Sequence, residues 1–272
     1  MAVLSVDLAY RRWTDLGIVV LSRASAPAEG SNTGFVNRGT AQSIVECQII
    51  PSTAAGIADG SSGGPIDAEI LAGRLNHLCA VRGIRVMMLD GPQAWKSKDN
   101  GLAHARVSER QLNTAAKTGL PGMVKPATYR PFAEFCLDVW DALCRRGWRR
   151  LDTCDRSGTQ HDRVLVESYP YAAWKSLGLK PLPAKRRARV SHLAEAYGAL
   201  RSVIPFTTDR PPNHDQLQAI VGGLPGLALE ASNPGAVRIV GNPPRREQGH
   251  WREGFIVLPL PPQQPHGWRW LN

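Results

Sequence analysis

The pattern of apolar and polar positions divides this chain of 272 residues into short apolar runs and longer amphipathic segments. Apolar runs bounded by Gly, Pro, Ser or Asn predict strands, and apolar residues repeating every three or four positions predict helices. Strands are expected at residues 3–9, 17–22, 43–50, 84–90, 163–168 and 254–259. Helices are expected at residues 65–83, 105–116, 131–147, 170–177, 184–202 and 212–230.

The order of these elements predicts the fold class. Three strands with short connections come first, and single strands then alternate with helices, which gives the order β-β-β-α-β-α-β-α. This order predicts an α/β protein with a mixed β-sheet flanked by helices, including extra helical insertions. We expect a single domain over residues 1–260 and a proline-rich C-terminal tail over residues 261–272.

Acidic residues stand on, or at the ends of, three expected strands. These are Asp7, Asp90 and Glu167, and a fourth, Asp215, lies in the first turn of an expected helix. An ionised carboxylate in an apolar strand is costly unless something pairs with it. If the four side chains converge, their mutual repulsion calls for divalent cations, and oxygen-only ligands select Mg²⁺ or Mn²⁺. Two such ions can activate a water and stabilise the leaving oxygen of a phosphodiester.

Each acidic residue also has an ordinary structural interpretation. Asp7 could face solvent on a half-polar strand, and Asp90, which precedes Gly-Pro, could be a turn residue. Glu167 could be a solvent-facing residue at a strand end. Asp215 near a helix start suits the helix dipole with no further role. Their combination with the order of elements favours one shared site.

The formal net charge of +10 indicates that the protein binds an acidic partner. Basic residues cluster at 145–150, 180–189 and 242–247, and such clusters suit a polyanion. Tryptophans beside them (Trp13, Trp148 and Trp174) could stack on bases. The residues expected to contact nucleic acid, DNA or RNA, are Arg11, Arg12, Lys96, Arg186 and Arg187. The alternative is that the basic runs are simply solvated faces.

Cysteine spacing and hydropathy argue against disulfide-rich, zinc-ribbon, membrane-spanning and secreted proteins. The five cysteines (Cys47, Cys79, Cys136, Cys144 and Cys154) form no CxxC pair, so we expect reduced thiols rather than disulfides or a zinc ribbon. No apolar run reaches the roughly 18 residues that a membrane span needs. Asp7, Arg11 and Arg12 interrupt any signal-peptide core, so a cytoplasmic protein is expected.

Six stretches together resemble a family of ribonuclease-H-like nucleases of uncharacterised function that are related to the RuvC-type resolvases. They are SVDLAYRRWTDLGIVVL, MLDGPQAW, ARVSER, VLVESYPYAAWKSLGL, NHDQLQAIVGGL and EGFIVLP, and they span most of the chain. The resemblance implies a ribonuclease-H-like fold, with Asp7, Asp90, Glu167 and Asp215 as metal ligands and catalytic residues.

The resemblance also implies that Arg106 and Glu109 lie near the site, although at i and i+3 they could be a surface ion pair. The chain departs from the family where His214 precedes Asp215, because the family usually carries two acids there. His214 could be a second metal ligand, a proton shuttle or a residue that merely begins a helix.

Three functional classes follow. The first is a divalent-metal-dependent nuclease that hydrolyses phosphodiester bonds, and the second is a non-catalytic nucleic-acid-binding or adaptor protein on the same fold. The third is an actin-like or sugar-kinase-like ATPase. It ranks last because the turn DLAYRRWTDLG lacks the glycine that a phosphate-binding hairpin needs.

Overall fold

The computed structural model describes residues 2–23, 44–51, 64–153 and 162–261. The main-sheet strands are β1 (Ala2–Asp7), β2 (Gly17–Arg23), β3 (Val45–Ile49), β4 (Val86–Asp90), β7 (Arg149–Arg150), β8 (Val164–Ser168), β9 (Phe206–Thr208), β10 (Val237–Val240) and β13 (Ile256–Pro259). Two short hairpins pair β5 (Lys117–Thr118) with β6 (Val124–Lys125), and β11 (Arg245–Glu247) with β12 (His250–Arg252). The α-helices are α1 (Ala68–Arg82), α2 (Val107–Leu112), α3 (Arg130–Arg145), α4 (Pro170–Ser176), α5 (Val190–Val203) and α6 (His214–Glu230).

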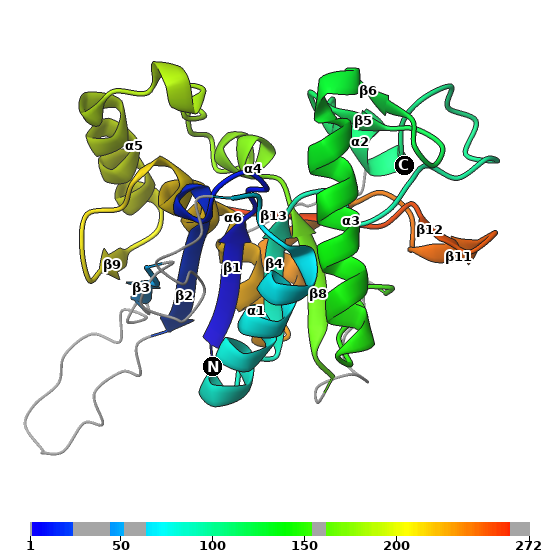
Figure 1. The fold of residues 1–272 in the computed structure, drawn as a ribbon. Coiled ribbons are helices and arrows are strands. Elements are labelled where there is room, and N and C mark those ends of the chain that lie inside the picture. Colours follow the sequence, from blue (N-terminus) through cyan, green and yellow to red (C-terminus); the bar gives the residue numbers. More distant parts are fainter. Residues whose placement is uncertain (1, 24–43, 52–63, 154–161, 262–272) are drawn as a thin grey trace, which may run out of the picture.

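The main sheet has the order β10-β13-β8-β4-β1-β2-β3-β9, with β7 also paired to β8. The first three strands form an antiparallel meander, whereas β1, β4, β8 and β13 run parallel to one another. The fold is therefore mixed α/β, as the order of elements predicts, and it is consistent with a ribonuclease-H-like arrangement. Because β1, β4 and β8 are parallel, their carboxyl ends meet at one edge of the sheet, between the α4–α5 side and the α2–β5–β6 side (Figure 1).

Both faces of the sheet are covered by helices, and each face has its own apolar core. Helices α4 and α6 pack on one face over side chains such as Val3 and Met88. Helices α1 and α3 pack against each other over the opposite face, which carries Leu4 and Leu89 (Figure 1). Strands buried on both faces read as continuous apolar runs, which is the pattern seen at residues 84–90.

Helix α6 lies unusually close to the sheet because it carries glycines where it crosses β1. A Cβ built on Gly223 would stand 2.7 Å from Cβ of Ser5, and one on Gly226 would stand 2.6 Å from a methyl carbon of Val3. Larger residues at these positions would push the helix away. This close packing determines where the first turn of α6 meets the end of β1.

Several expected boundaries shift in the structure. Helix α1 begins at Ala68 with the Asp67 side chain accepting from the Ile70 amide, rather than at Pro65, and Gly83 ends it in the left-handed conformation as expected. The single helix expected at 184–202 is divided into a 3-10 turn (Lys185–Arg187) and α5. The short strands β7, β9 and β10 were not predicted, because their two to four residues are too few to show a period.

The predicted tail, residues 261–272, lies outside the described residues except for Pro261, so the predicted domain boundary at residue 260 stays a prediction. Among the helices of the described segments, none is long and apolar enough to cross a membrane.

Candidate functional site

Asp7 and Asp90 stand side by side at the carboxyl ends of two neighbouring parallel strands. They are register partners across β1 and β4, so both side chains leave the same face of the sheet. Their carboxyl groups lie within hydrogen-bonding reach of each other, and such a hydrogen bond forms only when one of the two holds a proton. Burial raises the pKa of Asp7 well above its usual value, and the nearby Asp90 and Asp215 carboxylates raise it further. Burial also raises the pKa of Asp90 to about 7.

Asp215 reaches this pair from the first turn of α6. The helix begins at His214, and the Asn213 side chain caps it by accepting from the Gln216 amide. The Asp215 side chain is buried and close enough to raise the pKa of Asp7. Its carboxylate forms an ion pair with Lys185, whose ammonium also binds Asp15 at 2.8 Å. Three of the four predicted carboxylates therefore gather at the α6 face of the sheet.

Glu167 does not join them on that face. In β8 it is Ser168, not Glu167, that pairs in register with Asp90, and Glu167 pairs with Leu89. Side chains alternate along a strand, so Glu167 points toward the α1–α3 face. Both of its carboxylate oxygens are held by Arg106, at 2.7 and 2.6 Å, and one also accepts from the Gln93 amide at 3.1 Å.

Arg106 is the centre of a buried network, not of a surface ion pair. Its guanidinium binds Glu167 with two nitrogens, and its Nε donates to Glu109 and to the Thr118 hydroxyl, each at 3.0 Å. Burial alone would lower the pKa of Arg106, but the Glu167 and Glu109 carboxylates hold it above its usual value. Burial raises the pKa of Glu167, and Arg106 opposes that rise. Glu167 connects this network to Asp90, whose pKa it raises, and the functional role of Arg106 and Glu109 stays a prediction.

His214 has neither ring nitrogen free. Its Nδ1 lies 3.2 Å from an Asp215 oxygen, and its Nε2 lies 2.9 Å from the Pro183 carbonyl oxygen. In this arrangement it begins α6 and ties the helix to the 180–189 segment. Sequence reasoning missed Lys185 and Asp15, which complete this side of the site. The only signal for Lys185 was its place in the basic run.

A divalent cation needs several oxygen ligands that are free to bind it. Within the described ranges, no three His, Cys, Asp or Glu side chains are grouped so that they could hold a metal ion as they stand. Glu167 and Asp215 are instead bound to Arg106 and Lys185. The Asp7–Asp90 pair fits a hard cation, since it offers only oxygen ligands and a bound cation would relieve the charge repulsion between them. The four-carboxylate metal site thus stays a prediction, with Asp7 and Asp90 as its best-supported part.

The prediction of the nucleic-acid-binding surface is wrong for Lys96 and for the three tryptophans. Lys96 is buried, and its ammonium donates to the Ser97 carbonyl, so it is not displayed to a phosphate backbone. The three tryptophans proposed to stack on bases are all core residues, with exposed fractions of 5% for Trp13, 2% for Trp148 and 0% for Trp174.

The 145–150 cluster is largely neutralised within the fold. Arg145 and Arg146 both pair with Glu69, and Arg150 is buried against Asp141 at 2.7 Å. Arg149 is bound by two aspartates. In the 242–247 cluster, Arg245 pairs with Asp99 and Glu247. These two clusters are not free basic surfaces.

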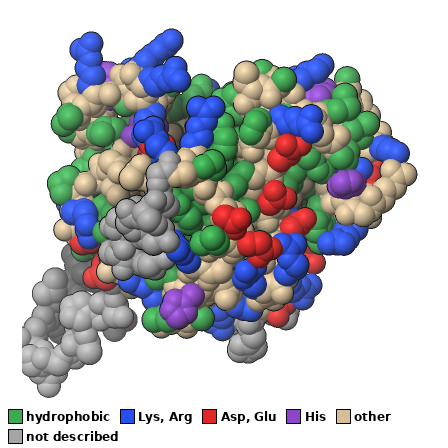
Figure 2. Space-filling view, viewed as in Figure 1, with side chains coloured by type: hydrophobic (Ala, Val, Ile, Leu, Met, Phe, Trp, Pro, Cys, Tyr) green, Lys and Arg blue, Asp and Glu red, His purple; other side chains and the backbone are tan. Residues whose placement is uncertain are grey.

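The remaining predicted cations are exposed. Arg186 and Arg187 have no acidic partner in the described part of the chain, whereas Arg12 pairs with Asp15 and Arg11 donates to the Tyr10 hydroxyl. Figure 2 shows Lys and Arg side chains standing out at the upper left, the side on which α5 lies in Figure 1, while acidic side chains gather near the middle of this face. The 180–189 segment is therefore the basic surface nearest to Asp215.

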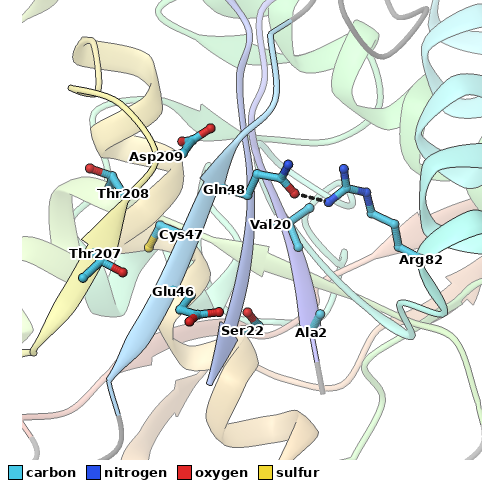
Figure 3. A pocket seen from close by; sticks show the side chains of 10 residues that line it. All are labelled: Ala2, Val20, Ser22, Glu46, Cys47, Gln48, Arg82, Thr207, Thr208 and Asp209. Atoms are coloured by element: carbon cyan, nitrogen blue, oxygen red, sulfur yellow. Dashed lines mark hydrogen bonds between the residues drawn. The ribbon is translucent and has the colours of Figure 1, made fainter. Parts of the chain in front are cut away.

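A hollow lies away from these residues, over the β2–β3–β9 part of the sheet. It has a volume of about 610 Å³, and Figure 3 shows its polar lining, including the Gln48–Arg82 hydrogen bond. Glu46 and Asp209 are its acidic residues, and the Asp209 carboxylate accepts from the Ile49 amide. None of the predicted site residues lines it, so it has no part in the chemistry of Asp7 and Asp90.

The described cysteines are all free. Cys47, Cys79 and Cys136 are buried and Cys144 is half-buried, as expected for reduced thiols. Burial raises the pKa of the Cys47 and Cys79 thiols to about 12, so neither is a nucleophile at neutral pH. Cys154 lies outside the described residues.

Comparisons with known proteins add little to this geometry. No family model and no curated protein matches the chain. Among solved structures, the Thermus thermophilus RuvC structure aligns with 86% of this chain and 98% of its own, at 12% identity and a TM-score of 0.36. A likeness this low carries no weight for the activity. The family resemblance drawn from the sequence motifs therefore stays a prediction.

Proposed function

We propose that this protein is a divalent-metal-dependent nuclease on a ribonuclease-H-like fold. The observation that carries this proposal is the Asp7–Asp90 pair, two carboxyl groups in register at the ends of parallel strands and close enough to share a proton. A shared proton marks a place where the protein holds more negative charge than it can pair. Mg²⁺ or Mn²⁺ is the cation that an oxygen-only site prefers.

Asp7 and Asp90 would hold the ion, and Asp215 would join them on release from Lys185. When bound, divalent ions polarise an attacking water and neutralise charge on the leaving oxygen of a phosphodiester. Lys185, once released, remains on the exposed basic segment with Arg186 and Arg187, where it can contact the substrate backbone. Arg106 binds both carboxylate oxygens of Glu167, so Glu167 would not be free to join the ion at Asp90.

The test is metal binding followed by cleavage. Thermal melts with increasing Mg²⁺ or Mn²⁺ should show stabilisation that grows with the logarithm of metal concentration. Asp7→Asn and Asp90→Asn should each abolish this stabilisation, and Asp138→Asn is the matched control. Asp138 lies on α3, where burial and two acidic neighbours raise its pKa, but it is not in the site. Cleavage of labelled single- and double-stranded DNA and RNA should require the metal and both aspartates.

The second candidate is a non-catalytic nucleic-acid-binding protein on the same fold. The observation that favours it is that Arg106 and Lys185 already neutralise Glu167 and Asp215. A protein that binds nucleic acid but shows no metal-dependent stabilisation and no cleavage would establish this candidate and overturn the nuclease. The ATPase is the weakest of the three, because a buried Trp13 occupies the turn where a phosphate-binding hairpin would lie.

A further inference from the structure

A second, smaller pocket opens directly beside the candidate site. It has a volume of about 200 Å³, and Asp90 and Glu167 are among its lining residues. Its other walls carry three aromatic side chains, Tyr129, Phe132 and Tyr169. Tyr129 ends the turn before α3, Phe132 lies in the first turn of α3, and Tyr169 follows β8 directly. Two separate segments, the start of α3 and the end of β8, thus bring aromatic rings to one side of Asp90.

These rings are accessible to a ligand. Tyr129 is 42% exposed, and Phe132 and Tyr169 are half-buried. Phe132 is supported by Tyr10, whose ring centroid lies 6.2 Å away. Each nucleobase has a flat aromatic face, and stacking on a protein ring stabilises single-stranded complexes without regard to sequence.

The charges of the pocket decide which part of a nucleotide it can take. Asp90, Glu109 and Glu167 face a single cation, Arg106, so the lining would repel a phosphate. Its polar groups are also largely engaged. The Thr118 hydroxyl lies between Arg106 and Glu109. Tyr169 is hydrogen-bonded to the Ala115 backbone. A neutral ring suits this lining better than an anion.

We infer that the pocket receives one unstacked nucleobase of the substrate strand, an inference that rests on the proposed function. Asp90 belongs both to the pocket and to the Asp7–Asp90 pair, so a base held against Tyr129 would place its own backbone next to those carboxylates. The occupant is therefore a single-stranded or locally unpaired segment, because a base inside a duplex cannot leave its stack without cost. With few free polar groups on the walls, the pocket should accept all four bases.

The experiment measures binding of a short fluorescent single-stranded oligonucleotide to the full chain by anisotropy, in the presence of a chelator. Tyr129→Ala should weaken binding by at least about fivefold, whereas Tyr129→Phe, which keeps the stacking face, should stay within about twofold. Tyr171→Ala is the matched control, because Tyr171 is 45% exposed on neighbouring α4 but does not line the pocket. Oligonucleotides of A, C or T alone should bind with similar affinity.

A second variant distinguishes loss of the pocket from loss of the folded structure. Ala115→Leu narrows the pocket from its exposed rim and leaves Tyr129 in place, so it should also weaken binding while the melting temperature stays that of the parent. If the parent binds no nucleic acid, the proposed function itself fails. If the parent binds but Tyr129→Ala and Ala115→Leu bind equally well, the nucleobase pocket alone is overturned. A strong preference for one base would likewise contradict stacking as the means of recognition.

Discussion

The backbone of Asp215 lies directly against Gly17: a Cβ built on Gly17 would stand 2.1 Å from the Asp215 carbonyl oxygen. Gly17 is also the register partner of Asp7 in β2. One glycine therefore allows the first turn of α6 to approach the end of β1, and this approach brings the Asp215 carboxylate to the Asp7–Asp90 pair. The geometry of the candidate site depends on a missing side chain as much as on the acidic ones.

Gly17→Ala should displace the start of α6 and separate Asp215 from Asp7. We expect metal-induced stabilisation in thermal melts to fall sharply and the metal-free protein to lose about 1–3 kcal/mol from overpacking. Gly198→Ala is the control, because Gly198 lies exposed in the middle of α5 with nothing within 4 Å of an added Cβ. It should leave metal binding unchanged and raise stability by up to about 1 kcal/mol. Equal metal binding by Gly17→Ala and the parent would contradict the role of this contact.

The metal-free protein should become less stable as pH rises through neutrality. Burial and mutual repulsion raise the folded-state pKa of Asp7, and that of Asp90 rises from 3.8 to about 7. The folded chain therefore binds more protons than the unfolded chain between about pH 4 and pH 7, so the free energy of unfolding falls across this range. Denaturant melts at pH 5.5 and pH 8 in a chelator should show the loss, and Asp7→Asn should reduce it. A free energy that rises over the same range in the parent would refute the shared proton.

Arg106→Met should be strongly destabilising. The substitution leaves the Glu167 and Glu109 carboxylates buried without their cation, which costs about 3–5 kcal/mol. Arg130→Met provides the comparison, since its pair with Glu134 has the same chemistry but is exposed, at 55% and 41%. That change should cost no more than about 1 kcal/mol. Urea denaturation measures both, and similar values for the two variants would show that the Arg106 network contributes no more than a surface pair.

The basic segment at 180–189 should supply contacts to the nucleic-acid backbone. Arg186→Gln combined with Arg187→Gln should reduce the slope of log affinity against log salt by about 0.7 to 0.9 for each lost phosphate contact. The matched variant Arg145→Gln with Arg146→Gln changes the same formal charge in a cluster that Glu69 already neutralises. Its slope should stay close to that of the parent. Equal slopes for all three proteins would remove this segment from the interface.

Most of the helices and strands of this protein can be predicted from local patterns along the chain. Apolar runs of strand length mark β1, β2, β4 and β8, and Gly83 ends α1 as expected. Asp90 ends such a run, so its position at a strand end is a local property of the chain, whereas Asp7 was expected inside a strand over residues 3–9 and instead ends β1. Local patterns suffice here because period and turn chemistry depend on neighbouring residues.

Which side chains meet depends on how the elements pack, and local patterns do not contain this information. A strand buried on both faces is apolar throughout, so its pattern does not say which residues face which layer. Only the register of β4 with β8 shows that Ser168, not Glu167, shares a face with Asp90. One residue of register turns every side chain to the opposite face.

Ion pairs between distant segments also could not be predicted from the sequence, because local patterns do not show which segments pack together. Arg145 finds Glu69 across 76 residues, and Lys185 finds Asp15 across 170. Charge clusters that look free along the chain are therefore neutralised or exposed according to how the helices pack. Composition records the number of charges, but the free energy of each one depends on its burial and its partners, and only the folded chain determines these.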